Sequence, residues 1–267
     1  MDNWLIAILL GIIEGITEFL PISSTGHLII ANALFSFTGN FAALFDIVIQ
    51  TGAIFAVLIY FRKSLFFAVK DPKEKKQTLL LWRKILICVL PIIILGFLFG
   101  DLIQKYLFTP FFVAWMLLIG GILLLWIEKN FKTQKTKNIH EITFKTALII
   151  GLFQCFALLP GFSRAGATII GALVLGVERK TATLFSFFVA IPVLIGASIY
   201  SLFLYFQNGF FLTINEIFLL VLGFLVSFIV AFLVIKWFIT FISKHDFTFF
   251  GLYRIVLGII ILILIIL

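Results

Sequence analysis

Apolar residues along this chain are grouped into long runs separated by short polar segments. A helix that crosses a bilayer needs roughly 17 to 25 predominantly apolar residues. Six runs approach that length, and they cover about 41–61, 80–100, 108–127, 183–206, 215–236 and 250–267. The pattern therefore predicts six membrane-spanning helices.

Two further apolar regions, 3–35 and 143–175, are interrupted near their middle by proline, glycine, serine and charged or polar residues. Each region is long enough for two half-spans. Non-helical backbone at membrane depth is stable only where protein or a wet cavity satisfies its polar groups. We therefore predict two re-entrant helical hairpins, within an all-α integral membrane fold.

The two interrupted regions come into register, without a gap, when the sequence is shifted by 140 residues. The aligned pairs include Gly11 and Gly151, Glu14 and Gln154, Ser23 and Ser163, and Ser24 and Arg164. Each copy holds one hairpin and three spans, so the second copy must enter the membrane from the opposite face. The sequence thus predicts one membrane domain over 1–267, built from two inverted repeats at 1–127 and 143–267.

Composition and charge fit this interpretation. Hydrophobic residues make up 63% of the 267 residues and charged residues 12%, which is typical of a membrane protein. The net charge of +8 arises in loops: basic residues gather in 62–84 and 128–145, and the same side receives Arg179, Lys180, Lys236 and Lys244. The opposite loops carry only Lys105. Because cytoplasmic loops collect lysine and arginine, we expect both termini and the mouth of the first hairpin outside, and no nucleic-acid partner.

The first hairpin, "GIIEGITEFLPISSTGHLII", holds ionisable residues inside an apolar run. Such a group costs about 2.5 to 3.5 kcal/mol on insertion scales, so it is a functional candidate by default. Glu14 and Glu18 are four residues apart and share one helix face. A hard divalent cation, a shared proton or an opposing arginine would relieve the repulsion between their carboxylates. The pair is therefore a candidate metal site.

Both hairpin turns offer groups that bind phosphate. Pro21 ends the first helix, and exposed amides and hydroxyls at a following turn suit an anion. The candidate phosphate ligands are Ser23, Thr25, Ser163, Arg164 and Thr168. Arg164 is taken as the lone intramembrane cation, and its planar fork suits phosphate. Alternatively, Arg164 acts only as a counter-ion for the two glutamates. For His27, the alternative is a packing role without function.

Two broken helices that meet from opposite faces would bring these groups together near the centre of the membrane. Such a set suits a phosphorylated lipid: metal and Arg164 neutralise the phosphates, His27 handles a proton, and Ser24 or water attacks. Asp46, Gln50 and Gln154 are expected to support the contacting residues, with a structural role equally open for Asp46. A transporter or flippase of an anionic lipid is the main rival function, because inverted repeats with broken helices also build transporters.

The segments "EGITEFLPISSTGH" and "PGFSRAGATI" resemble the two signature motifs of the undecaprenyl-diphosphate phosphatase family, also called the bacitracin-resistance phosphatases. The resemblance extends to "FDIVIQTGAI", "LFQCFALLPGFSR" and "FSFFVAIP". It implies a bacterial inner-membrane enzyme that removes the terminal phosphate of undecaprenyl diphosphate, which recycles the lipid carrier for cell-wall synthesis. It also implies a divalent cation, Mg²⁺ or Ca²⁺, and a polyprenyl diphosphate as the lipid substrate.

By motif position, the resemblance makes Glu14 and Glu18 the acidic, metal-binding pair. It places Ser24 and His27 in the catalytic turn, and Ser163 and Arg164 in the phosphate-binding turn. We predict catalytic roles for Glu18, Ser24, His27 and Arg164. One departure is Ala165, which stands where the family commonly has the second serine of Ser-Arg-Ser. A hydrogen bond between Ser24 and His27, three residues apart, is expected if Ser24 is the nucleophile. The sequence leaves the nucleophile, the preferred metal and the oligomeric state open, a homodimer included.

Overall fold

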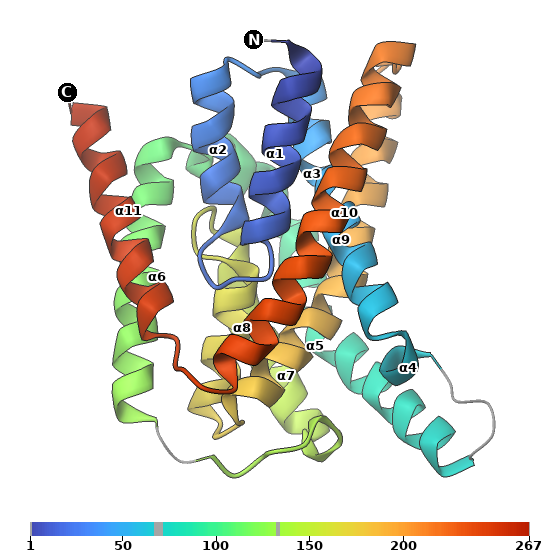
Figure 1. Ribbon diagram of the computed structural model, residues 1–267, viewed down its shortest axis with the longest axis vertical. Coiled ribbons are helices and arrows are strands. Elements are labelled where there is room, and N and C mark those ends of the chain that lie inside the picture. Colours follow the sequence, from blue (N-terminus) through green and yellow to red (C-terminus); the bar gives the residue numbers. More distant parts are fainter. Residues whose placement is uncertain (1, 67–71, 132–133, 267) are drawn as a thin grey trace.

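A computed structural model describes residues 2–66, 72–131 and 134–266 (Figure 1). Lys70 and Lys132, which belong to the basic segments 62–84 and 128–145, lie outside the described residues. Regular structure in the described part is helical, apart from one isolated parallel bridge between Thr136 and Val177. Within these ranges, six helices have the length and hydropathy to cross a membrane: α3 (Asn40–Tyr60), α5 (Pro72–Leu107), α6 (Pro110–Asn130), α9 (Arg179–Gln207), α10 (Ile214–Ile242) and α11 (Thr248–Ile266). The prediction of an all-α membrane protein with six spans is confirmed.

The largest difference from the predicted boundaries is at α5, which has 36 residues instead of the apolar run 80–100. The residues that precede this run, "KEKKQT", include strong helix formers, so the helix extends beyond the apolar stretch. A helix of this length measures about 54 Å and exceeds a hydrocarbon core of about 30 Å. Its polar first turns therefore extend beyond the apolar segment.

The two interrupted regions form helical hairpins. In the first, α1 (Asn3–Thr17) and α2 (Ser24–Phe35) are joined by residues 18–23, the first loop. In the second, α7 (Phe144–Gln154) and the short η2 (Cys155–Leu158) lead into residues 159–163, the second loop, and then α8 (Arg164–Val174). Figure 1 shows α1 and α2 in the half of the molecule that carries both termini, and α7 and α8 in the other half. The two loops lie between these halves.

Both loops end in the same local structure. Ser23 and Ser163 have φ of 72° and 76°, a left-handed conformation that is uncommon outside glycine. Each is the N-cap of the next helix, and its hydroxyl accepts the amide N–H of Gly26 or Gly166 at 3.2 and 3.0 Å. The cap hydrogen bond offsets the strain of the left-handed backbone. These residues are 140 positions apart, while the division of the whole chain into two inverted repeats stays a prediction.

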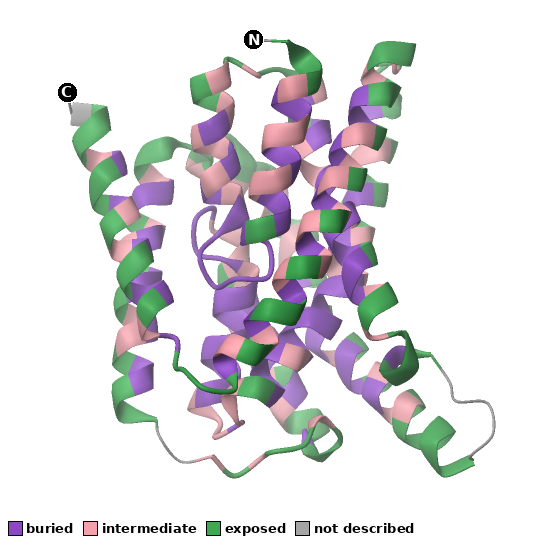
Figure 2. Ribbon diagram, viewed as in Figure 1, coloured by how far each residue is buried: buried purple, intermediate pink, exposed green. Residues whose placement is uncertain are grey.

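Small residues allow the helices to pack closely around the loops. A Cβ atom added at Gly11 would lie 2.8 Å from the carbonyl oxygen of Gly223, and one at Gly15 would lie 2.8 Å from that of Ser227, so α1 lies directly against α10. Figure 2 shows buried positions concentrated at the loops and on inward helix faces. Large apolar side chains cover the outside, Phe97 and Phe211 among them. The fold thus encloses the two polar loops in an apolar shell.

Candidate active site

Glu18 connects the two loops at the centre of the molecule. Its Oε1 accepts a hydrogen bond from Nη2 of Arg164 at 2.8 Å, in an ion pair whose side chains are only 8% and 5% exposed. Its Oε2 accepts the hydroxyl proton of Ser24 at 2.5 Å. The structure therefore brings together three residues predicted for catalysis, from α2, the first loop and the start of α8.

Arg164 is held by further contacts on α8 and α9. Its Nη1 donates to the carbonyl oxygen of Ser186 at 2.9 Å. The hydroxyl of Thr168 donates to Oγ of Ser186 at 2.7 Å, which ties α8 to the same point of α9. Nε of Arg164 is buried and has no partner among the described residues. One strong donor therefore stays free for a ligand.

Glu14 lies one helical turn before Glu18, beside it and within electrostatic reach of Asp46 and Arg164. Both carboxylate oxygens of Glu14 are buried without a hydrogen-bond partner in the described part of the chain. A buried carboxylate in this state needs a proton or a cation. The donor set therefore fits a divalent cation, with Glu14 more available than Glu18, whose oxygens have partners. No group of three histidine, cysteine or acidic residues among those described is placed to hold a metal.

His27 is oriented differently from the prediction. Its Nδ1 lies 2.7 Å from the carbonyl oxygen of Ser23, and its Nε2 lies 2.7 Å from the hydroxyl of Tyr253. Because a carbonyl can only accept, Nδ1 carries the proton and Nε2 accepts the Tyr253 O–H. The expected hydrogen bond between Ser24 and His27 is not formed, because both side chains have other partners. Ser24 turns back to Glu18, and the imidazole turns to the carbonyl one helical turn earlier.

The loops also point backbone dipoles at this centre. α2 begins at Ser24 and α8 begins at Arg164, directly after the two loops. The first amide N–H groups of a helix have no partner within that helix and carry the positive end of its dipole. Two such ends at neighbouring loops favour an anion. The site thus combines a guanidinium, two helix starts and hydroxyls, which are suited to a phosphate.

The remaining predicted residues lie at the margin of this cluster. Asp46 accepts a hydrogen bond from the side chain of Asn32 at 2.5 Å, and its other carboxylate oxygen is buried without a partner in the described chain. Gln154 is buried and donates to the carbonyl of Cys88 at 3.4 Å. Thr25 and Gln50 are half-buried, and neither bonds to the predicted site residues in the described ranges.

Arg254 was missed by the sequence reasoning. It lies within α11 and is fully buried, so the interpretation of Arg164 as the lone intramembrane cation is wrong. Its guanidinium donates to backbone carbonyls of both loops and of α6. A charged residue inside the apolar run 250–267 was a signal available in the sequence. Tyr253 and Ser186 carried no such signal, because their contacts join distant parts of the chain.

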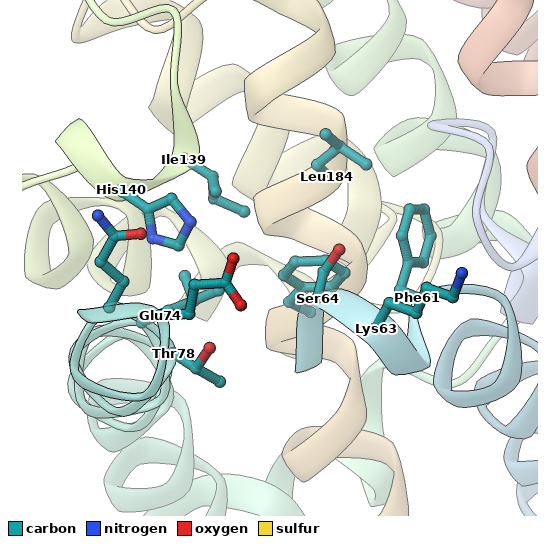
Figure 3. Close-up of a pocket in the computed structure, with 11 residues that line it drawn as sticks. Phe61, Lys63, Ser64, Glu74, Thr78, Ile139, His140 and Leu184 are labelled. Carbon is teal, nitrogen blue, oxygen red and sulfur yellow. The ribbon is translucent and has the colours of Figure 1, made fainter. Parts of the chain in front are cut away.

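A cavity of about 290 Å³ lies elsewhere, where α4 (Arg62–Leu65), α5 and η1 (Ile139–Glu141) meet (Figure 3). Lys63, Glu74 and His140 are among its lining residues. Burial, with a smaller effect of Lys84, lowers the pKa of His140, which favours the neutral ring. The cavity contains none of the predicted catalytic residues. The cluster at the two loops is therefore the stronger candidate for the active site.

This chain resembles known proteins over nearly its full length. The family model described as "Bacitracin resistance protein BacA" matches residues 7–260. The chain belongs to that family. Among similar curated proteins is "Undecaprenyl-diphosphatase 1" of Clostridioides difficile (strain 630), 47% identical over 260 residues, which are 96% of this chain and 94% of the relative. An "Undecaprenyl-diphosphatase" of Polaromonas sp. (strain JS666) is 47% identical over 261 residues, 96% and 93% of the two chains. One from Fusobacterium nucleatum subsp. nucleatum is 46% identical over 265 residues, 96% and 98% of the two chains.

Proposed function

We propose that this protein is an undecaprenyl-diphosphate phosphatase, which releases the terminal phosphate of the lipid and leaves undecaprenyl phosphate. The observation that supports this most directly is the contact of Ser24, Glu18 and Arg164 across the two loops. It joins a hydroxyl, a carboxylate and a guanidinium at one point, and these groups suit a nucleophile, a proton acceptor and a phosphate ligand. Membership of the bacitracin resistance family and the names of the curated relatives support the same activity.

The arrangement supports Ser24 as the attacking group. Oγ of Ser24 loses its proton to Oε2 of Glu18 and forms a bond to the terminal phosphorus, while the bond from that phosphorus to the bridging oxygen breaks. Undecaprenyl phosphate leaves with the electron pair of that bond. Water then attacks the phosphoserine, inorganic phosphate departs, and the proton returns to Oγ. Arg164 and the helix starts hold the phosphate oxygens, on which negative charge gathers during both steps.

Glu14 and Glu18 are the residues that would hold Mg²⁺ or Ca²⁺. The unpartnered oxygens of Glu14 support this assignment, since oxygen ligands suit both ions. When bound, the ion would neutralise charge on the diphosphate. In this proposal His27, with the proton on Nδ1, would accept a proton at Nε2 from the attacking water through the Tyr253 hydroxyl and would then return it to the departing inorganic phosphate. Asp46 and Gln154 would keep α3 and α7 in register with the acidic pair.

The distribution of basic residues supports an orientation in a bacterial inner membrane. The loops rich in lysine and arginine would face the cytoplasm, and both termini would face the exterior. In that orientation α1 and α2 open to the exterior. The site would then receive a lipid whose diphosphate lies at the outer leaflet.

Phosphate release by the purified protein tests the activity. In detergent with Mg²⁺, the protein should release inorganic phosphate from undecaprenyl diphosphate over many turnovers. A lipid transporter, the alternative, would move the same lipid across vesicle membranes with its diphosphate intact. Lipid movement in vesicles without phosphate release in either system would reject the phosphatase and favour the transporter.

A further inference from the structure

Arg254 occupies the point where α6, α11 and the two loops meet, and neither of the hairpin motifs includes it. Its side chain is fully buried. Nη1 donates to the carbonyl oxygen of Pro21 at 3.2 Å, and Nη2 donates to that of Gly161 at 3.2 Å. Pro21 lies three residues before Ser24, and Gly161 lies three residues before Arg164. One guanidinium therefore contacts corresponding positions of both loops.

The same side chain is anchored to α6. Nη2 also donates to the carbonyl of Met116 at 3.1 Å, and Nε donates to that of Leu117 at 3.4 Å. The ring of Phe162, in the second loop, lies 5.7 Å from Cζ. All these partners are backbone carbonyls or an aromatic face, and no carboxylate in the described chain forms a salt bridge with Arg254. Only arginine has enough donors in a fixed plane to reach three segments at once.

Burial of a charge without an opposite charge is costly, which makes a purely stabilising purpose a poor explanation. An apolar side chain of similar volume could fill the same space between α6 and α11 without that penalty. An apolar group cannot donate hydrogen bonds, whereas the guanidinium fixes the directions of one carbonyl in each of the two loops. It also lies near enough to His27 for their charges to interact.

Glycines at this point make room for the guanidinium. A Cβ atom added at Gly120 of α6 would lie 1.9 Å from Nη2 of Arg254, and one at Gly166 of α8 would lie 2.9 Å from Nη1. Gly120 thus permits the guanidinium to lie against α6. An alanine at this position would displace the guanidinium while leaving its charge in the protein.

We propose that Arg254 is a positioning residue, which holds the first and second loops in register so that Ser24 and Arg164 face the same phosphate. The proposal rests on the proposed phosphatase function for its kinetic consequences. A displacement of about 1 Å in a catalytic group can lower the rate about 100-fold. We therefore expect Arg254→Gln to lower kcat by about that factor, with KM within about threefold of the wild-type value. Arg254→Lys should restore little, since one ammonium cannot contact both loops.

Gly120→Ala is the decisive variant, because it displaces the guanidinium without removing it. It should lower kcat nearly as much as Arg254→Gln, and the double variant should be no slower than Arg254→Gln alone. Gly196→Ala in the interior of α9 is the control: it makes the same change within a helix, and its added Cβ would meet no atom within 4 Å. That control should keep kcat within about threefold.

A distance measurement tests the positioning role without reference to activity. Spin labels at Leu34 on α2 and Leu175 after α8, in a background without native cysteines, should give a narrow distance distribution in wild type. Arg254→Gln and Gly120→Ala should broaden it, and Gly196→Ala should not. An unchanged distribution in both variants, or folded Gly120→Ala with wild-type kcat, would overturn the proposal. If the wild-type protein released no phosphate, the proposed function would be rejected instead. The distances between the spin labels would then still test whether Arg254 holds the two loops in register.

Discussion

Replacement of Arg164 by lysine keeps a positive charge in the site but removes the planar fork. In the structure Nη2 binds Glu18 at 2.8 Å and Nη1 binds the carbonyl of Ser186 at 2.9 Å, while Nε has no partner within the described ranges. A single ammonium can take one of these directions and cannot present parallel donors to a phosphate. The variant therefore tests whether the geometry of Arg164, and not its charge alone, supports catalysis.

The expected loss follows from the hydrogen bonds that lysine cannot replace. A hydrogen bond to a charged group contributes about 1.5 to 3 kcal/mol. Since each 1.36 kcal/mol changes a rate tenfold, one lost bond to the transition state lowers kcat/KM by roughly 10- to 100-fold. Arg164→Ala should be only slightly slower than Arg164→Lys.

The assay is phosphate release from undecaprenyl diphosphate, together with thermal unfolding in detergent. Arg179→Lys is the matched control, because Arg179 also binds a buried carboxylate, Glu128, through Nε and Nη2, at the start of α9 and outside the site. Both lysine variants should lose some stability, but only Arg164→Lys should lose activity per folded molecule. A folded Arg164→Lys protein with kcat/KM within threefold of wild type would refute the reasoning.

Three further predictions concern the metal, His27 and the orientation. Calorimetry should detect Mg²⁺ binding to wild type and at least about tenfold weaker binding to Glu14→Gln, and EDTA should stop turnover; full turnover in EDTA would reject the metal. Tyr253→Phe removes one neutral hydrogen bond from His27. Because such a bond contributes about 0.5 to 1.5 kcal/mol, this variant should lower kcat about tenfold or less. The control variant Tyr200→Phe, on the exposed face of α9, should leave kcat unchanged. Equal effects of the two tyrosine variants would argue against a role for the contact with His27. With native cysteines removed, an impermeant maleimide applied to whole cells should label a cysteine introduced at Thr109 and spare one at Lys75; the reverse pattern would invert the orientation.

The spans and hairpins could be predicted because bilayer thickness imposes a length that the sequence displays directly. The breaks at Pro21 and Pro160 likewise stand out within apolar runs. The start of α5 could not be located in this way, since the polar helix formers before the apolar run extend the helix but contribute no apolar signal. The left-handed backbone at Ser23 and Ser163 was also beyond prediction, because serine rarely adopts it.

The sequence predicted which residues form the site, but not which of them contact one another. Glu14, Glu18, Ser24 and Arg164 were found because polar groups within apolar runs are rare, but the partner of Ser24 depends on how the first loop folds back. Tyr253 contacts His27 across 226 positions of the sequence, and no local sequence pattern predicts such a pair. Arg254 differs from Tyr253 in this respect, because a charged residue within the last apolar run is visible in the sequence itself.

The proposed mechanism requires that Ser24, directly after the first loop, supplies the attacking hydroxyl, and that Arg164, directly after the second loop, holds the phosphate under attack. Rapid quenching with undecaprenyl diphosphate labelled with ³²P in its terminal phosphate tests this claim most directly. Wild type should yield labelled phosphoserine at Ser24 before free phosphate accumulates. Ser24→Ala should yield neither, and Arg164→Ala should form the phosphoserine at least about 10-fold more slowly. Rapid release of labelled phosphate by folded Ser24→Ala would contradict the claim and identify water as the attacking group.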